Sequence, residues 1–421
     1  MNQEQLHFGR VAAALILAAV LIMCLPLQAQ AAAGSKDRDT GKQISVDCEG
    51  AAVLDVHSGR ILYSKNGTGK FYPASTTKIM TMLVALENAD SLSQTVKASK
   101  NAVYGIDPSS TAIDLKVGEK MTLKEALYGV QLASANDAAV AIAESVGGSV
   151  HKFAGMMNKK AKELHLKNTH FTNPHGLYDP NHYTCPEDLA RITQAALANP
   201  QYVKIFTTLY HVIPRTNKSK KRELYNTHRM VKYQPSYHPA VIGGKTGYIT
   251  ESAFNLVTVG RKNGMELAIV TMRGISADAM VQDTRKLLNY YLRHYHELTI
   301  KPSLRPMQIG GLNNQKVKAA KSVKVMVPKS VKSADLRCRA ELSDHLRFPV
   351  SKGTKIGTVE VLSGSTVVGT TDLLADETLL TTSLHNMHLA VAIAVPCLLG
   401  AVIVVLVVVL VRCRGQKKSK S

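Results

Sequence analysis

The sequence predicts an α+β fold in which strands from both ends of one large domain enclose a helical middle. Near the N-terminal end, "AAVLDVHSGRILYSKNG" alternates apolar and polar residues on both sides of a Ser58-Gly59 turn, which is typical of a β-hairpin. Helical periodicity follows, and strand-like alternation returns from Gly243. The simplest arrangement is one antiparallel sheet that joins the strands of both ends, with helices packed against it.

The elements of this domain can be placed in order along the chain. We expect strands at Ala51–Val56 and Ile61–Ser64, and then a helix that opens at Ser75. Further helices are predicted at Leu123–Leu132, Asp137–Val146, "KFAGMMNKKAKELHL" and "PEDLARITQAALAN". The last of these begins with proline and carries acidic residues in its first turn, a favourable helix start.

The C-terminal part of the chain is richer in strands. "FNLVTVG" and "MELAIVTMRG" are separated by "RKNG", whose Asn263-Gly264 pair strongly favours a hairpin. Ser276–His296 is expected to form a long closing helix. After Pro302, short alternating runs such as "SVKVMVP" predict a small β-domain that ends near Leu374.

The two ends of the chain carry targeting signals of different kinds. Arg10 precedes an apolar run, Val11–Leu25, and the small residues "AQAAA" follow it, so residues 1–31 are expected to be a signal peptide. Leu389–Val411 is an apolar stretch of 23 residues, and about 20 are enough to span a bilayer. A buried core helix is the alternative interpretation of this stretch. The basic tail 412–421 favours a cytoplasmic C-terminus, so we expect an exported protein held by a C-terminal anchor.

Charge and cysteine content narrow the class of protein further. The net charge is +21, and about +16 remains without the five cations of the tail, so the exported part is attracted to anionic polymers or lipid headgroups. Nucleic acid is not the expected partner, because the protein is exported and carries no recognisable nucleic-acid motif. Three of six cysteines, Cys48, Cys185 and Cys338, lie in the exported part, and their wide spacing predicts no disulfide framework.

Three short motifs carry the chemistry, and each alone is weak. They are Ser-x-x-Lys at Ser75–Lys78, Ser-x-Asn at Ser134–Asn136 and Lys-Thr-Gly at Lys245–Gly247. The first two motifs also occur elsewhere, at Ser149–Lys152, Ser64–Asn66 and Ser99–Asn101. Order and context select the first set, because Ser75 opens an apolar helix, Ser134 lies between two helices and Lys245 leads into a strand.

The Ser75–Lys78 pair has a direct chemical interpretation. A serine hydroxyl needs a base before it can act as a nucleophile, and a residue three positions along a helix lies on the same face. A helix cap with a solvated lysine is the simpler alternative, but a cation near a helix N-terminus opposes the macrodipole. Burial and a second cation would lower the pKa of Lys78, and Lys245 is the candidate cation. The Ser75 backbone N–H at the helix start is a candidate oxyanion donor.

Together, these motifs resemble those of the low-molecular-mass penicillin-binding proteins, the serine-type D-alanyl-D-alanine carboxypeptidases. "PASTTKIMT", "ASANDAAVAIAE", "FTNPHGL" and "GGKTGYITESAFNLV" carry the resemblance, which covers roughly residues 48–374. It implies a penicillin-binding/β-lactamase-like catalytic domain, a small C-terminal β-domain and no cofactor. The implied substrate is a peptidoglycan stem peptide that ends in D-Ala-D-Ala, and β-lactam antibiotics are implied covalent inhibitors.

The resemblance also implies roles for individual residues. Ser75 would be the acylated nucleophile, Lys78 its base and Ser134 the proton shuttle towards the leaving amine. The implied substrate-binding residues are Asn136, which would bind the substrate amide, and Lys245, Thr246 and Gly247 of the motif that anchors the terminal carboxylate. A second oxyanion donor would follow this motif on its strand. Ala135 and Tyr248 depart from common family residues, and Tyr248 bears on substrate preference.

The resulting domain organisation places the catalytic part outside the cytoplasm of a bacterial cell, on a single-pass membrane anchor. The expected segments are a signal peptide (1–31), a catalytic domain (45–300), a β-rich domain (301–375), a linker (376–388), a transmembrane helix (389–411) and a cytoplasmic tail (412–421).

Other functions share the same motifs and stay open at this point. A β-lactamase would need a deacylating base, for which Glu187 is the nearest candidate. A D,D-endopeptidase or transpeptidase would differ only in the bond cut or the acceptor, and a catalytically silent wall-binding sensor would keep the pocket without turnover. His175 is expected to order its loop. It and the nearby histidines lack zinc-site patterns, so no metal is expected.

Overall fold

The structure is a computed structural model that describes residues 38–418, and these divide into two compact units. Unit 1 holds most of the chain up to Leu288. Unit 2 holds the chain from Asn289 onward. It also includes two short segments from earlier in the chain, Asp55–Arg60 and Arg261–Leu267. The predicted signal peptide (1–31) and the end of the predicted tail (419–421) lie outside the described residues.

Unit 1 is built on a five-stranded sheet of order β2-β1-β9-β8-β7. Its strands are β1 (Gly50–Asp55), β2 (Ile61–Lys65), β7 (Val241–Ile249), β8 (Ala253–Lys262) and β9 (Met265–Gly274). The β1–β2 and β7–β8 pairs are antiparallel. The prediction of one sheet from N- and C-terminal strands is therefore confirmed, and β7 lies at its edge.

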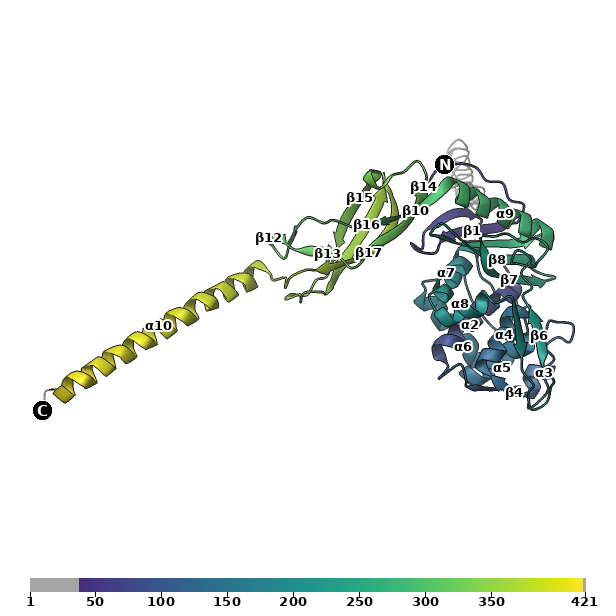
Figure 1. Cartoon of the computed structure of the whole chain (residues 1–421), viewed down its shortest axis with the longest axis horizontal. Helices are drawn as coiled ribbons and strands as arrows, with labels where there is room; N and C mark the ends of the chain where they lie inside the picture. The colour runs from purple at the N-terminus through teal and green to yellow at the C-terminus, as the bar shows by residue number, and fades with distance from the viewer. Residues whose placement is uncertain (1–37, 419–421) are drawn as a thin grey trace, which may run out of the picture. The chain divides into compact units, whose positions relative to one another are not determined.

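Helices cover both faces of this sheet, with α9 on one side and the helical middle of the chain on the other (Figure 1). The helices are α2 (Lys78–Asn88), α3 (Lys100–Tyr104), α4 (Leu123–Leu132), α5 (Asn136–Gly147), α6 (Val150–Glu163), α7 (Pro186–Leu197), α8 (Pro200–Phe206) and α9 (Ala277–His294). Two small hairpins, β3 (Thr95–Lys97) with β4 (Lys120–Thr122) and β5 (Tyr210–Ile213) with β6 (Arg222–Tyr225), complete the unit.

Burial explains why these segments are helices. The first eight residues of α5 are all buried, and six of them, Ala138–Ala143, are apolar, so this helix is a central helix of the unit. Thr122 caps α4 by accepting the Glu125 N–H, and α7 begins at Pro186, which needs no intrahelical hydrogen-bond partner for its nitrogen. The predicted helix start at Ser75 is wrong in detail. Ser75 lies in a 3₁₀ turn, Ala74–Thr77, and the α-helix begins at Lys78.

Unit 2 is rich in strands, as the sequence predicts. It contains a two-stranded β10–β14 sheet, a β11–β12 hairpin and a four-stranded β13-β17-β16-β15 sheet. The strands are β10 (Tyr295–Ile300), β11 (Met307–Ile309), β12 (Leu312–Gln315), β13 (Val317–Ala319), β14 (Val323–Pro328), β15 (Leu336–Leu342), β16 (Lys355–Ser363) and β17 (Thr366–Ala375). Alternate residues of these strands fill two apolar clusters, one around Ile356, Val359 and Leu373 and the other around Val325, Val327 and Val361.

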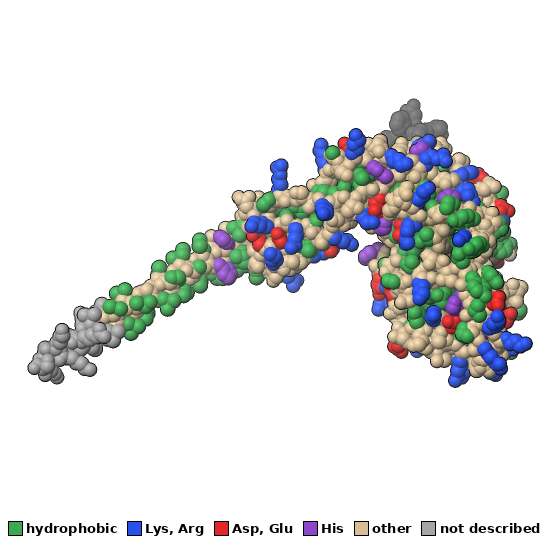
Figure 2. Space-filling view, viewed as in Figure 1, with side chains coloured by type: hydrophobic (Ala, Val, Ile, Leu, Met, Phe, Trp, Pro, Cys, Tyr) green, Lys and Arg blue, Asp and Glu red, His purple; other side chains and the backbone are tan. Residues whose placement is uncertain are grey.

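The chain continues into α10 (Thr382–Lys418), whose apolar side chains between Met387 and Val407 are exposed (Figure 2). Its segment Thr382–Val407 is long and apolar enough to cross a membrane, by length and composition. The predicted span, 389–411, falls within α10. The helix begins at Thr382, so it includes the second half of the predicted linker, 376–388.

Candidate active site

Two glycines define the position of the 3₁₀ turn that carries Ser75. Ala74 has a positive φ of +48°, a conformation that is unfavourable for a residue with a side chain. A Cβ on Gly176 would lie 1.8 Å from the Ala74 carbonyl oxygen, and one on Gly247 would lie 2.9 Å from the Pro73 oxygen. Only glycine permits such close approaches. The "NPHGL" and Lys-Thr-Gly segments therefore hold the serine turn from two sides.

Lys78 is fully buried directly beside Ser75. Its Nζ lies 2.8 Å from Ser75 Oγ. The other two neighbours of Nζ are the Asn136 side-chain oxygen at 2.6 Å and the His175 carbonyl oxygen at 2.9 Å. Both of these oxygens can only accept hydrogen bonds. A neutral amine would give its two N–H groups to them, and its lone pair would then face the Ser75 hydroxyl.

The environment of Lys78 favours this neutral form. Burial, and then the nearby Lys245 cation, lower the pKa of Lys78 well below its usual value, although the Asp137 carboxylate acts in the opposite direction. Burial lowers the pKa of Lys245 as well, to about 7. The site thus combines a buried amine, able to accept a proton, with a second amine whose charge suppresses protonation of the first.

The Ser134–Asn136 segment turns sharply between α4 and α5. Ser134 has a φ of +57°, and its carbonyl accepts a hydrogen bond from Thr111 Oγ1 at 2.8 Å. The buried Asp137 carboxylate accepts the backbone N–H groups of Ile113, at 3.1 Å, and Leu115, at 2.9 Å. These contacts connect the turn to the loop before β4.

Lys245 joins this turn to the edge strand β7. Its Nζ is buried and donates to Ser134 Oγ at 2.9 Å and to the Thr246 carbonyl at 3.1 Å. All three motifs therefore meet around Ser75, through the chain of contacts that runs from Lys78 to Asn136 and from Ser134 to Lys245.

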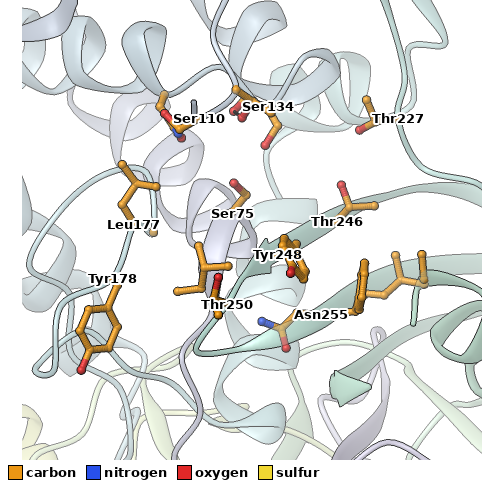
Figure 3. A pocket seen from close by; sticks show the side chains of 18 of the residues that line it. Ser75, Ser110, Ser134, Leu177, Tyr178, Thr227, Thr246, Tyr248, Thr250 and Asn255 are labelled. Atoms are coloured by element: carbon orange, nitrogen blue, oxygen red, sulfur yellow. Dashed lines mark hydrogen bonds between the residues drawn. The ribbon is translucent and has the colours of Figure 1, made fainter. Parts of the chain in front are cut away.

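A cavity of about 770 Å³ opens over this cluster (Figure 3). Ser75, Ser134, Asn136, Thr246 and Gly247 line it. Lys78 and Lys245 lie beneath the surface and reach the cavity through the serine hydroxyls that they contact. The structure thus brings all seven predicted site residues together.

The cavity also contains residues that the sequence analysis missed. Thr227 and Arg229 both line it, with Thr227 on the side of Thr246 (Figure 3), and Arg229 forms an ion pair with Asp278 at 2.8 Å. Both belong to an irregular segment without helical or strand periodicity, so no sequence pattern pointed to them. Asp137 was missed because an acidic residue in the first turn of a helix is ordinarily explained as a partner of the helix dipole.

Two residues considered in the sequence have roles that the structure makes explicit. Glu187 accepts hydrogen bonds from Ser64 Oγ, at 2.6 Å, and from Arg38, at 2.8 Å, and it is not among the residues that line the cavity. It is therefore not placed to activate a deacylating water there. His175 contributes its backbone oxygen to Lys78, while its ring accepts the Leu177 N–H. Burial, followed by the Lys78 and His182 charges, lowers the pKa of His175 to about 3.

The fold and the cluster around Ser75 define a serine-type hydrolase of the penicillin-recognising class. Residues 37–276 match the peptidase S11 family of D-alanyl-D-alanine carboxypeptidases, and residues 303–380 match the C-terminal domain of penicillin-binding protein 5. The chain belongs to the D-alanyl-D-alanine carboxypeptidase family.

Individual relatives agree with this assignment. The chain is 31% identical over 386 residues to the D-alanyl-D-alanine carboxypeptidase DacF of Bacillus subtilis, covering 86% of this chain and 94% of DacF. The crystal structure of penicillin-binding protein 5 from Haemophilus influenzae aligns with a TM-score of 0.67 at 27% identity, over 80% of this chain and 98% of that one. The Streptomyces K15 DD-transpeptidase aligns with a TM-score of 0.55 at 28% identity, over 59% of this chain and 98% of that one.

Proposed function

We propose that this protein is a serine D,D-carboxypeptidase that removes the terminal D-alanine from peptidoglycan stem peptides through an acyl-enzyme on Ser75. Family membership supports the class of reaction. The observation that carries the assignment of Ser75 is the position of Lys78 Nζ, 2.8 Å from Ser75 Oγ, with two acceptor oxygens on its other sides.

Acylation then follows from the geometry. Ser75 Oγ attacks the carbonyl carbon of the penultimate D-alanine while its proton passes to the Lys78 lone pair. The Ser75 backbone N–H, together with an N–H on the outer edge of β7, stabilises the oxyanion that develops. The C–N bond breaks as the leaving amine of the terminal D-alanine takes a proton through Ser134. Water then hydrolyses the ester and returns the free Ser75 hydroxyl.

The side of the cavity that carries Thr246 and Thr227 binds the substrate carboxylate. Lys245 provides a cation, Thr246 and Thr227 provide hydroxyl groups, and Arg229 provides a guanidinium group that suits a planar carboxylate. Asn136 is placed to bind the substrate amide. Penicillins offer a carboxylate next to a strained amide, so the same residues would direct them to Ser75 and form a stable adduct.

The protein acts at a membrane in this proposal. The apolar part of α10 anchors it to a bacterial cell membrane with the catalytic domain (45–300) and the β-domain (301–375) outside the cytoplasm and the basic tail inside. The signal peptide, 1–31, would be removed on export.

Two readouts on the same preparation test the function. Full-length protein in detergent would be mixed with penicillin and measured by intact-protein mass spectrometry, and D-alanine release would be followed from diacetyl-L-Lys-D-Ala-D-Ala. A stable adduct on Ser75 with D-alanine release supports the carboxypeptidase. Rapid penicillin hydrolysis without D-alanine release would instead identify a β-lactamase, and product formation only with an added amine acceptor would identify a transpeptidase.

A further inference from the structure

The cavity extends beyond Ser75 on the side away from the proposed carboxylate anchor. In Figure 3, Ser75 lies between Thr246 and Thr227 on one side and Leu177 and Tyr178 on the other. A peptide whose C-terminal carboxylate occupies the first side must place its preceding residues on the second. Substrate selection at these residues therefore depends on what lines the cavity near Tyr178.

The charges that line the cavity are unevenly placed. Three of the lining residues are charged, namely Asp107, Arg229 and Glu251. Arg229 follows Thr227 by two residues, and Thr227 lies on the side of the proposed carboxylate anchor. Glu251 lies in the turn between β7 and β8, and its carboxylate, after the contact with Tyr72, contributes to a raised pKa of Tyr178. Within the part of the chain that the structure describes, no lysine or arginine forms an ion pair with Glu251, so its charge is available to a ligand.

Two of the aromatic rings at the cavity are strongly exposed. Tyr178 is 50% exposed and packs edge-on against Tyr72 at 5.1 Å, and Tyr248 is 56% exposed and packs against Phe254 at 4.6 Å. Both exposed rings line the cavity. Rings held in this way present apolar surface to an aliphatic side chain.

The order of residues along β7 and the turn after it places Glu251 near the third residue of a peptide that pairs with β7. Because β7 is an edge strand, an extended peptide can pair with it. With the terminal residue beside Thr246, the residue two positions earlier in the peptide lies beside Tyr248. Strand β7 ends at Ile249, and Glu251 lies in the turn that follows it, so Glu251 is near the end of the strand beside which the third residue would lie. Lysine carries its charge on a flexible four-carbon stem, which suits a partner beyond the end of the strand.

We propose that Glu251 is a specificity residue that pairs with a free side-chain ammonium on the third residue of the stem peptide, while Tyr178 and Tyr248 flank its aliphatic part. This inference rests on the proposed function and names its substrate class: stems whose diamino acid carries a free amine. Stems in which that amine is acylated, as in a cross-link, lose the ion pair and are poorer substrates.

The test compares Nα-acetyl-L-Lys-D-Ala-D-Ala with its Nα,Nε-diacetyl form on full-length protein in detergent, with D-alanine release as the readout. We expect kcat/KM to favour the free amine by about 2–5-fold, mainly through KM, and the preference to weaken at high salt because ions screen an exposed pair. Glu251→Gln should reduce the ratio to about one and leave kcat/KM for the diacetyl peptide unchanged.

Glu223→Gln is the matched control, because Glu223 is an exposed carboxylate on β6 outside the cavity, and it should keep the wild-type ratio. Equal turnover of both peptides by the wild type, or an unchanged ratio in Glu251→Gln, would overturn the inference while leaving the carboxypeptidase intact. Release of D-alanine from neither peptide would refute the proposed function and this inference with it.

Discussion

Replacing Lys245 with glutamine tests whether its charge keeps Lys78 in the neutral form. Lys245 lowers the pKa of Lys78, so its removal should raise that pKa. Two like charges about 4 Å apart repel by about 1–4 kcal/mol at the effective dielectric constants found between bulk water and a protein surface, so the effect of removing one of them is large enough to detect in a pH profile. Acylation needs neutral Lys78 and rises with pH through its pKa, so the acidic limb of the pH–rate profile should move to higher pH.

The assay is the second-order rate constant for acylation by a fluorescent penicillin, measured from pH 4 to pH 10. Penicillin also carries a carboxylate, so Lys245→Gln should lower the rate at every pH, and the position of the limb is the quantity that reports on Lys78. Lys245→Arg keeps a cation and is the matched control, with a limb close to that of the wild type. A limb that stays in place or moves to lower pH in folded Lys245→Gln would refute the electrostatic coupling.

Three further substitutions test other parts of the site. Lys78→Ala should lower acylation by about 10²–10⁴-fold, as expected for loss of a general base, and near-normal acylation of a well-folded variant, judged by its melting curve, would contradict that role. Gly247→Ala should slow acylation by about tenfold or more, because its Cβ would lie 2.9 Å from the Pro73 carbonyl oxygen. Unchanged kinetics would show that the turn that carries Ser75 can shift without loss of activity, which would contradict this reasoning. Asp137→Asn should move the acidic limb to lower pH, because loss of that carboxylate lowers the pKa of Lys78 further. Asp188→Asn, at another buried carboxylate that accepts a backbone N–H, should not move it, and a shift in both variants would mean that the effect is structural.

Much of the fold and the core of the site could be predicted because they depend on local sequence. The helix predicted at Leu123–Leu132 is α4 to the residue, since apolar periodicity and the Thr122 cap agree. The Ser75–Lys78 contact follows from a spacing of three residues in either kind of helix. Lys245 was identified as the cation near Lys78 only because three motifs occur in a recognisable order.

The remaining features depend on contacts between segments far apart in the chain. The turn at Ser75, with its positive φ at Ala74, packs directly against Gly176 and Gly247, and no pattern near residue 75 reveals these contacts. Arg229 reaches the cavity from an irregular segment, where neither periodicity nor capping chemistry distinguishes it from other surface arginines. Such residues become visible only when the fold brings them to the same cavity.

The most direct test of the account is a paired measurement on wild-type and Ser75→Ala full-length protein: intact mass after exposure to penicillin, and D-alanine release from diacetyl-L-Lys-D-Ala-D-Ala. The account predicts one stable penicillin adduct that maps to Ser75 and steady D-alanine release in the wild type, with both lost in Ser75→Ala while its melting curve is kept. An adduct on another residue, or D-alanine release that survives in Ser75→Ala, would contradict it.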